Sequence, residues 1–274
     1  MDRAPKLLAY RQAPGRASVF DVWCDCEVVG DERKRLLKFR ERPEGRTGIQ
    51  QELATRVRSH YDDAARIAND VQSLGYGRAA AILAERLPRT ARARSGELGE
   101  ILATELVEEQ LGYRVPIRRL RYKDGREMAL RGDDFIGISL DPQGNLAFLK
   151  GESKSRVNLS AATIAEARSA LSRDDGRPTP ASLLFVADRL MDSNGVGANL
   201  GRRIRNEVAD QGVPPARIAH ALFTMSQNAT PAALTQDLRS ADGLRNHVTV
   251  HLQIEDHQDF IAATYEEALA LGND

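Results

Sequence analysis

The sequence predicts an α/β fold in which a helix is followed by three strands, a second helix and a fourth strand. Apolar residues recur at helical spacing in ELGEILATELVEEQLGY, which follows Ser95 as a capping residue and ends near Gly112. Strand-like runs follow, separated by the turn signals KDG and DPQGN. The predicted core, of order αβββαβ, occupies residues 95–190.

The elements of this core have separate local signals. Its three strands are expected at 115–122, 134–140 and 146–155. Ser160 can cap the next helix, AATIAEARSALSR, and the apolar run SLLFVADRL predicts a buried strand over 182–190.

The flanking regions are compatible with a larger α/β protein but carry no recognisable chemistry. Residues 1–94 predict a strand region followed by helices, one of them over 50–74, and they are assigned to an N-terminal lobe. Residues 191–274 are expected to complete the same compact domain as the core, with a strand at 247–254 and a closing helix.

Composition excludes several classes of protein. With 42% hydrophobic and 28% charged residues, the chain is typical of a globular protein, and no apolar run could span a bilayer. The first residues lack the apolar stretch of a signal peptide, so a cytoplasmic location is expected, with no membrane partner. Alternation over 20–28 predicts a half-buried strand whose Cys24 and Cys26 both enter the core rather than bind metal.

The charge distribution bears on nucleic-acid binding only locally. Basic and acidic residues number 39 each, so the net charge gives no argument for a polyanionic partner. Arginine clusters over 86–94 and 114–126, near an acidic motif, and its planar fork matches phosphate oxygens. The other interpretation of each arginine is a solvated surface charge. Candidate DNA contacts are Arg118, Arg119, Arg121, Arg126 and Arg156.

The acidic motif is the strongest chemical signal. In LAFLKGESKSR the strand period places Glu152 and Lys154 on one face, and a hairpin turning at DPQGN brings Asp134 beside them. Two carboxylates can hold Mg²⁺, with Mn²⁺ as a substitute, while an ammonium orients the attacking water in phosphodiester hydrolysis. These residues predict a metal-dependent nuclease of the PD-(D/E)xK type, which has a restriction-endonuclease-like fold.

The order of elements, rather than the tripeptide, makes this signal specific. Six lysines and 18 glutamates in 274 residues give roughly 0.4 Glu-x-Lys matches by chance. A strand Glu-x-Lys can also be a solvent-facing ion pair worth less than about 1 kcal/mol.

The upstream helix offers a third carboxylate. Glu100 borders its packing stripe, whereas Glu97 is expected further towards solvent, so Glu100 is the preferred metal ligand. Both could instead favour the positive end of the helix without any catalytic role.

Two other motifs do not predict sites. The histidines of the C-terminal region, His247, His251 and His257, have no acidic pair between them, so surface or core histidines are expected rather than a zinc site. The glycines of NGVGANLG lack a phosphate-binding lysine, which argues against a P-loop.

The runs SGELGEILATELVEEQLGY, RGDDFIG and KGESKSR resemble the HamA family, the nuclease subunits of Hachiman antiphage defence systems. The resemblance covers roughly 95–190 and implies Glu100, Asp134, Glu152 and Lys154 as the active site. Asp133 stands where the motif has proline, which leaves Asp133 as an alternative ligand. The family also implies DNA as substrate and a HamB-like superfamily 2 helicase as partner, for which residues 1–94 would be a docking lobe.

Two other functions stay open at this point. One is a stand-alone restriction or repair nuclease of the same fold, and the other is a non-catalytic subunit that binds DNA or a partner.

Overall fold

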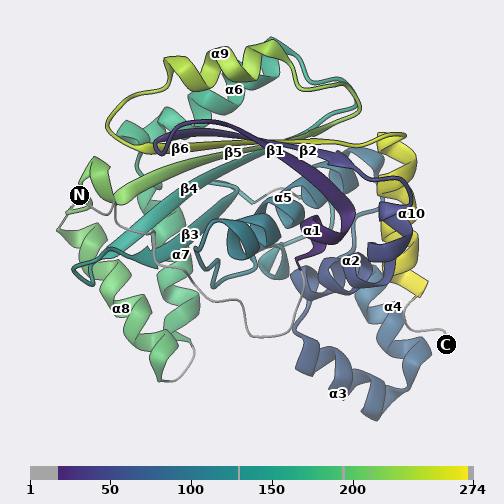
Figure 1. The fold of residues 1–274 in the computed structure, drawn as a ribbon. Coiled ribbons are helices and arrows are strands. Elements are labelled where there is room, and N and C mark those ends of the chain that lie inside the picture. The colour runs from purple at the N-terminus through teal and green to yellow at the C-terminus, as the bar shows by residue number, and fades with distance from the viewer. Residues whose placement is uncertain (1–17, 129, 193–194, 211, 271–274) are drawn as a thin grey trace.

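Six strands form one mixed sheet with helices on both faces (Figure 1). The computed structural model describes residues 18–128, 130–192, 195–210 and 212–270. The strand order is β1-β2-β6-β5-β4-β3, which confirms the α/β class. The strands are β1 Cys24–Gly30, β2 Lys34–Glu41, β3 Phe135–Leu140, β4 Leu146–Ser155, β5 Ile218–Ser226 and β6 Asn246–Gln253.

The centre of the sheet is parallel and its two edges are antiparallel hairpins. Strands β2, β6, β5 and β4 run parallel, while β1 pairs with β2 and β3 with β4 in antiparallel fashion. All nine residues of β5 are buried, as a parallel strand covered on both faces requires. The edge strand β1 is exposed beyond Cys24.

The two faces have different helical covers (Figure 1). One apolar cluster packs α1, α2, α5 and α10 against Leu149, Phe223 and Val250 on one face of the sheet. Two further clusters pack α6, α7, α8 and α9 against the opposite face. The α-helices are α1 Val19–Trp23, α2 Gly45–Tyr61, α3 Ala64–Leu74, α4 Tyr76–Arg86, α5 Ala91–Gln110, α6 Ala161–Ser172, α7 Pro180–Met191, α8 Val196–Ala209, α9 Ala232–Ser240 and α10 His257–Ala270. Short 3₁₀ turns are η1 Arg119–Tyr122, η2 Arg173–Gly176 and η3 Pro215–Arg217.

The first 94 residues share the sheet and the core with the rest of the chain. Strand β2 pairs with β6, and the largest apolar cluster runs from Val19 to Ala268. The described part of this region, 18–94, is therefore continuous with the core region rather than set apart from it. Its role in docking a partner stays a prediction.

The strand expected at 115–122 is absent, and a short 3₁₀ turn takes its place. Arg114 forms one isolated bridge with Ile138, after which the chain leaves the sheet. Ile117 and Leu120 are both buried, three positions apart, which is the spacing of a turn and not of a strand. The predicted order αβββαβ is wrong at this element.

The strand expected at 182–190 is also wrong, because this segment lies in helix α7. Thr179 caps it by accepting from the Ser182 amide at 3.2 Å, and Pro180 occupies the first turn. Its buried residues have the 3.6-residue period of a helix and are Leu183, Val186, Ala187 and Leu190. The parallel partner of β4 is instead β5.

Several boundaries differ from those expected. Helix α5 begins at Ala91 with Thr90 as its cap, so Ser95 lies inside the helix. The helix predicted over 50–74 is divided in two, and Asp63 caps the second part. Residues 19–23 are helical, and of the two cysteines only Cys24 is buried. The Ser160 cap, β6 and α10 are confirmed.

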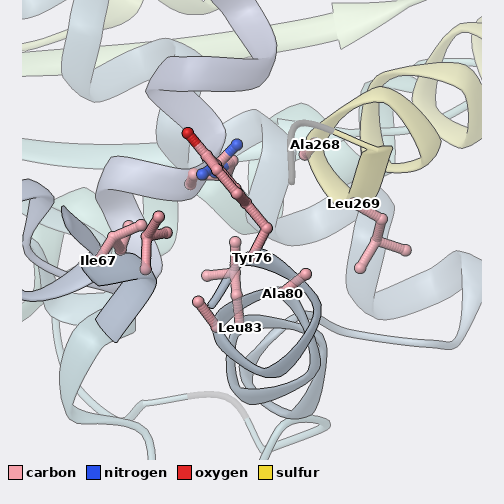
Figure 2. A pocket seen from close by; sticks show the side chains of 9 residues that line it. Ile67, Tyr76, Ala80, Leu83, Ala268 and Leu269 are labelled. Atoms are coloured by element: carbon pink, nitrogen blue, oxygen red, sulfur yellow. The ribbon is translucent and has the colours of Figure 1, made fainter. Parts of the chain in front are cut away.

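Helices α3 and α4 meet the end of α10 along an apolar seam (Figure 2). Ile67 and Leu83 line it from one side and Ala268 and Leu269 from the other. Its volume of about 10 Å³ is near the minimum for one water molecule. The seam is a packing contact and has no room for a substrate.

Gly151 of β4 is required by the ring of Phe135, its partner on β3. A Cβ atom at position 151 would lie 2.1 Å from Cε2 of that ring. Gly151→Ala is therefore expected to lower the free energy of unfolding by about 1–3 kcal/mol through overpacking. Thermal or urea unfolding would measure this loss.

Gly96→Ala is the matched control. A Cβ at Gly96 meets nothing within 4 Å, and alanine favours a helix interior over glycine by ~0.5–1 kcal/mol. An unchanged stability of Gly151→Ala beside a stabilised Gly96→Ala would contradict the packing described here.

Candidate active site

The β3–β4 hairpin places Asp134 next to Glu152 where the pairing of the two strands stops. The last paired residues at this end are Phe135 and Gly151, so β4 extends beyond β3. The amide of Ser153 has no β3 partner and donates to Asp134 Oδ2 at 2.8 Å. This bond holds the Asp134 carboxylate against the Glu152–Lys154 segment, where the sequence predicts it.

Asp133 and Asp134 have different surroundings. Asp133 is 5% exposed, accepts from the Thr179 amide at 2.8 Å and lies 3.5 Å from Lys150 Nζ. It therefore anchors the start of α7, away from the Glu-x-Lys pair. Of the two candidate ligands, only Asp134 has its carboxylate bonded to the Glu152–Lys154 segment.

Glu152 and Lys154 form a partly shielded ion pair on the α6 face of β4. Lys154 Nζ lies 2.9 Å from Glu152 Oε1 and 3.1 Å from Glu166 Oε1 of α6. Glu152 is 8% exposed, whereas Glu166 is largely exposed. The ammonium is thus held between two carboxylates, and the sequence analysis did not include Glu166.

Glu100 approaches the same place from the opposite face of the sheet. Helix α5 packs closely on β4 at Gly99, where a Cβ atom would lie 2.8 Å from Ser153 Oγ. Glu100, Asp134 and Arg119 line one small cavity between α5, η1 and β3. Arg119 was predicted as a DNA contact, and the structure places it beside these carboxylates.

Glu97 is not turned towards solvent as expected. It is 7% exposed, accepts from Tyr61 Oη at 2.7 Å and forms an ion pair with Lys123. Tyr61 in turn contacts Tyr265 Oη at 2.8 Å. The helical wheel misplaced Glu97 because it contains no information about α2, α10 and Lys123, which cover this side of α5.

The charge of Asp134 disfavours the ionised forms of Glu100 and Glu152. Burial and then the Asp134 charge raise the pKa of Glu152 to about 7 and that of Glu100 well above its usual range. Burial raises the pKa of Asp134 more than the Ser153 amide lowers it. For Lys154, burial lowers the pKa but the Glu152 bond and charge raise it overall. Negative charge here exceeds what Lys154 and Arg119 offset, as in many functional sites.

The donor set suits a hard divalent cation. Mg²⁺ takes oxygen ligands from one or two carboxylates and keeps several waters. Asp134 and Glu152 could hold it, and Glu100 could act through one of the waters. The three carboxylates are not drawn tightly together: among the residues described, the ligand atoms of this trio do not all lie within 4.8 Å of one another. A water-rich Mg²⁺ site fits that spacing.

The remaining predicted DNA contacts lie in ion pairs, with one exception. Arg118 pairs with Glu108 at 2.5 Å, Arg121 with Asp63 at 3.3 Å, and Arg126 with Glu85. Arg156 is exposed and donates to its neighbour's carbonyl at 2.8 Å. Their binding to DNA stays a prediction. Arg156 differs from the other three in contacting a backbone carbonyl rather than a carboxylate.

A family model described as HamA matches residues 17–268. The chain belongs to the HamA family. One curated relative is the Hachiman protein HamA of Bacillus cereus, 30% identical over 105 residues. That match covers 38% of this chain and 36% of the relative, so it spans about a third of the relative's length. In the described part of this HamA-family chain, no helix has both the length and the apolarity to cross a membrane.

The raised pKa of Glu152 predicts a pH-dependent stability. Because the folded state holds the proton up to about pH 7, the carboxyl costs no stability at low pH and lowers it as the pH rises to that value. Glu152→Gln removes this loss, so its melting temperature relative to the parent should be higher at pH 8 than at pH 5. We expect a difference of at least roughly 2 °C, measured without divalent cations.

Glu27→Gln on the exposed edge strand is the control, since its carboxylate is solvated beside Lys38. Its melting temperature relative to the parent should be nearly the same at both pH values. Equal behaviour of the two variants would contradict the electrostatic description of Glu152.

Proposed function

We propose that this protein hydrolyses phosphodiester bonds of DNA with Mg²⁺, as a nuclease of the PD-(D/E)xK type. The observation that carries the proposal is the meeting of Asp134, Glu152 and Lys154 at the end of the β3–β4 hairpin, with Glu100 facing Asp134. Burial and the Asp134 charge raise the pKa of Glu100 and Glu152, which costs stability, and a bound cation would offset that cost.

The residues have distinct roles in this proposal. Asp134 and Glu152 bind the cation, which polarises a phosphoryl oxygen and lowers the pKa of a bound water. Lys154 orients the attacking water and offsets charge that develops on the phosphate oxygens. Arg119 offers a second positive charge on the side of Glu100. Arg156, which is exposed and lies two positions after Lys154, is assigned to contact the DNA backbone.

Family membership supports a role in antiphage defence. The relative of 30% identity is named as a Hachiman protein, and we extend that system to this chain. The proposed partner is a HamB-like superfamily 2 helicase. A nuclease that cuts DNA without control would damage its own cell, so the helicase is proposed to restrain it until foreign or damaged DNA is engaged.

Cleavage of supercoiled and linear DNA tests the active site. The parent protein should cut in Mg²⁺ or Mn²⁺ and not in EDTA, alone or with the helicase and ATP. Glu152→Gln and Lys154→Met should each reduce the rate at least ~100-fold, because each removes a group that acts on the reacting phosphate. Nicking and linearisation on gels, with circular dichroism to verify folding, are the measurements.

Glu27→Gln and Lys38→Met are the matched controls. They make the same chemical changes in an exposed ion pair of 3.2 Å on β1 and β2, and both should cut like the parent. If folded parent protein never cuts DNA yet binds it, the chain is a non-catalytic binding subunit. If cleavage is equal with and without the helicase, the protein is a stand-alone nuclease.

A further inference from the structure

A second polar cluster lies where α6 and α9 cover the starts of β5 and β6. His220 and His247 are register partners on these two strands, with ring centroids 5.1 Å apart and ring planes at 84°. Asp242 follows α9 in the loop that leads into β6. One ligand atom from each of these three residues lies within 4.8 Å of the other two.

The hydrogen bonds of the two histidines leave one nitrogen of each ring available. His220 Nε2 donates to the Gly176 carbonyl at 2.7 Å, so Nδ1 carries the lone pair. A histidine that binds a metal usually donates its other ring nitrogen in this way. His247 is 2% exposed, and its Nε2 is buried without a hydrogen-bond partner, 3.4 Å from Asp242 Oδ2. A buried nitrogen left unpaired is costly, and a ligand would satisfy it.

Two arginines border the cluster, and neither blocks it. Arg168 is bound to Asp237 by three hydrogen bonds of 2.6–3.1 Å, and it also lies 3.3 Å from His247 Nδ1. Because arginine can only donate, this contact places the proton of a neutral His247 on Nε2. A cation at Nε2 requires the other tautomer, in which Arg168 gives up Nδ1 and keeps its bonds to Asp237. Arg245 contacts Asp242 Oδ2 at 3.1 Å and also donates to a backbone carbonyl. A cation would bind Asp242 Oδ2 either together with Arg245 or in its place.

We propose that His220, His247 and Asp242 bind a divalent first-row transition metal, with Zn²⁺ as the best match. Two imidazole nitrogens and one carboxylate oxygen are a common zinc ligand set, whereas Mg²⁺ prefers oxygen alone. An opening of about 180 Å³ beside the cluster, also lined by Ser172 and Ser240, leaves room for water as a fourth ligand. The ion would join β5, β6 and the α9–β6 loop, independently of the proposed nuclease function.

Zinc binding by the full-length protein tests this proposal. Metal-stripped protein is dialysed against Zn²⁺ with Mg²⁺ in excess, and bound zinc is measured by elemental analysis. We expect one equivalent in the parent. Co²⁺ in place of Zn²⁺ should give the visible absorption of a tetrahedral site with imidazole ligands. Parent protein that retains no zinc would overturn the proposal.

Variants assign the ion to its ligands. Asp242→Asn keeps the Oδ1 atom that accepts from the Leu244 and Arg245 amides, so the loop is expected to fold. Asp242→Asn and His220→Gln should each weaken zinc binding at least ~10-fold, a loss that even second-shell changes reach. His251→Gln is the control, a buried histidine on β6 that bonds to Thr224 instead.

Glu152→Gln separates this proposal from the active site. It should bind zinc as the parent does, because its carboxylate belongs to the other cluster. If Glu152→Gln loses zinc while Asp242→Asn and His220→Gln keep it, the histidine site is wrong and the ion belongs to the carboxylates. Equal zinc binding by all three variants also overturns the proposal.

Discussion

The hydrogen bond from the Ser153 amide to Asp134 is the contact on which the candidate site depends. It forms because β3 ends one residue short of Glu152, which leaves an amide of β4 to be satisfied by a side chain. The same bond brings the Asp134 charge close enough to raise the pKa of Glu152 and Glu100. Negative charge thus gathers where the β3–β4 pairing stops, because an unpaired backbone amide of β4 holds the Asp134 carboxylate there.

Close packing around this strand end explains its precision. Gly151 leaves space for the Phe135 ring of β3, and Gly99 lets α5 approach the serines of β4. The positions of β3 and α5 against β4 therefore both depend on glycine. Helix α5 then delivers Glu100 from one face while β4 presents Glu152 and Lys154 on the other. Close packing of this kind holds charged groups in place, whereas an exposed ion pair contributes little energy.

Local patterns in the sequence were sufficient to predict which hairpin residues lie together and insufficient for the topology around them. Strand parity and one hairpin bring Asp134, Glu152 and Lys154 together, since both are properties of a short segment. The strand expected at 182–190 fails because an apolar run fits a buried strand or a helix, although Thr179 and Pro180 signal a helix start. The position of Glu166 beside Lys154, and that of Arg119 beside Glu100 and Asp134, could not be predicted. Their roles come from contacts between α6, η1 and the sheet that no local spacing encodes.

The face of the sheet that carries Glu152 also carries a row of polar residues, which links the two proposed metal sites. Lys150 is cross-strand partner of His220, and His220 of His247. Lys150 binds Asp133 and two backbone carbonyls, so it is satisfied by structure rather than by a ligand. It stands between the carboxylates at the end of β4 and the imidazoles at the start of β5. Under the two proposals, oxygen donors on one side would favour Mg²⁺ and nitrogen donors on the other would favour Zn²⁺, so ligand type would keep the two ions apart.

The stability cost of burying the carboxylates bears on whether this protein is an enzyme. A subunit that only bound DNA would gain nothing from burying Glu100, Asp134 and Glu152, since acidic groups repel phosphate and their burial lowers stability above the pH at which they ionise. Under the proposed function, a cation bound between these carboxylates would offset that cost and attract the phosphate. The ion pair of Arg56 with Glu105 has the opposite effect, because the His60 hydrogen bond and the charges of His60, Arg118 and Arg56 lower the pKa of Glu105 to about 2 despite burial. On helix α5, the pKa is therefore lowered for Glu105 beside its cationic partners and raised, by burial and then by the Asp134 charge, for Glu100.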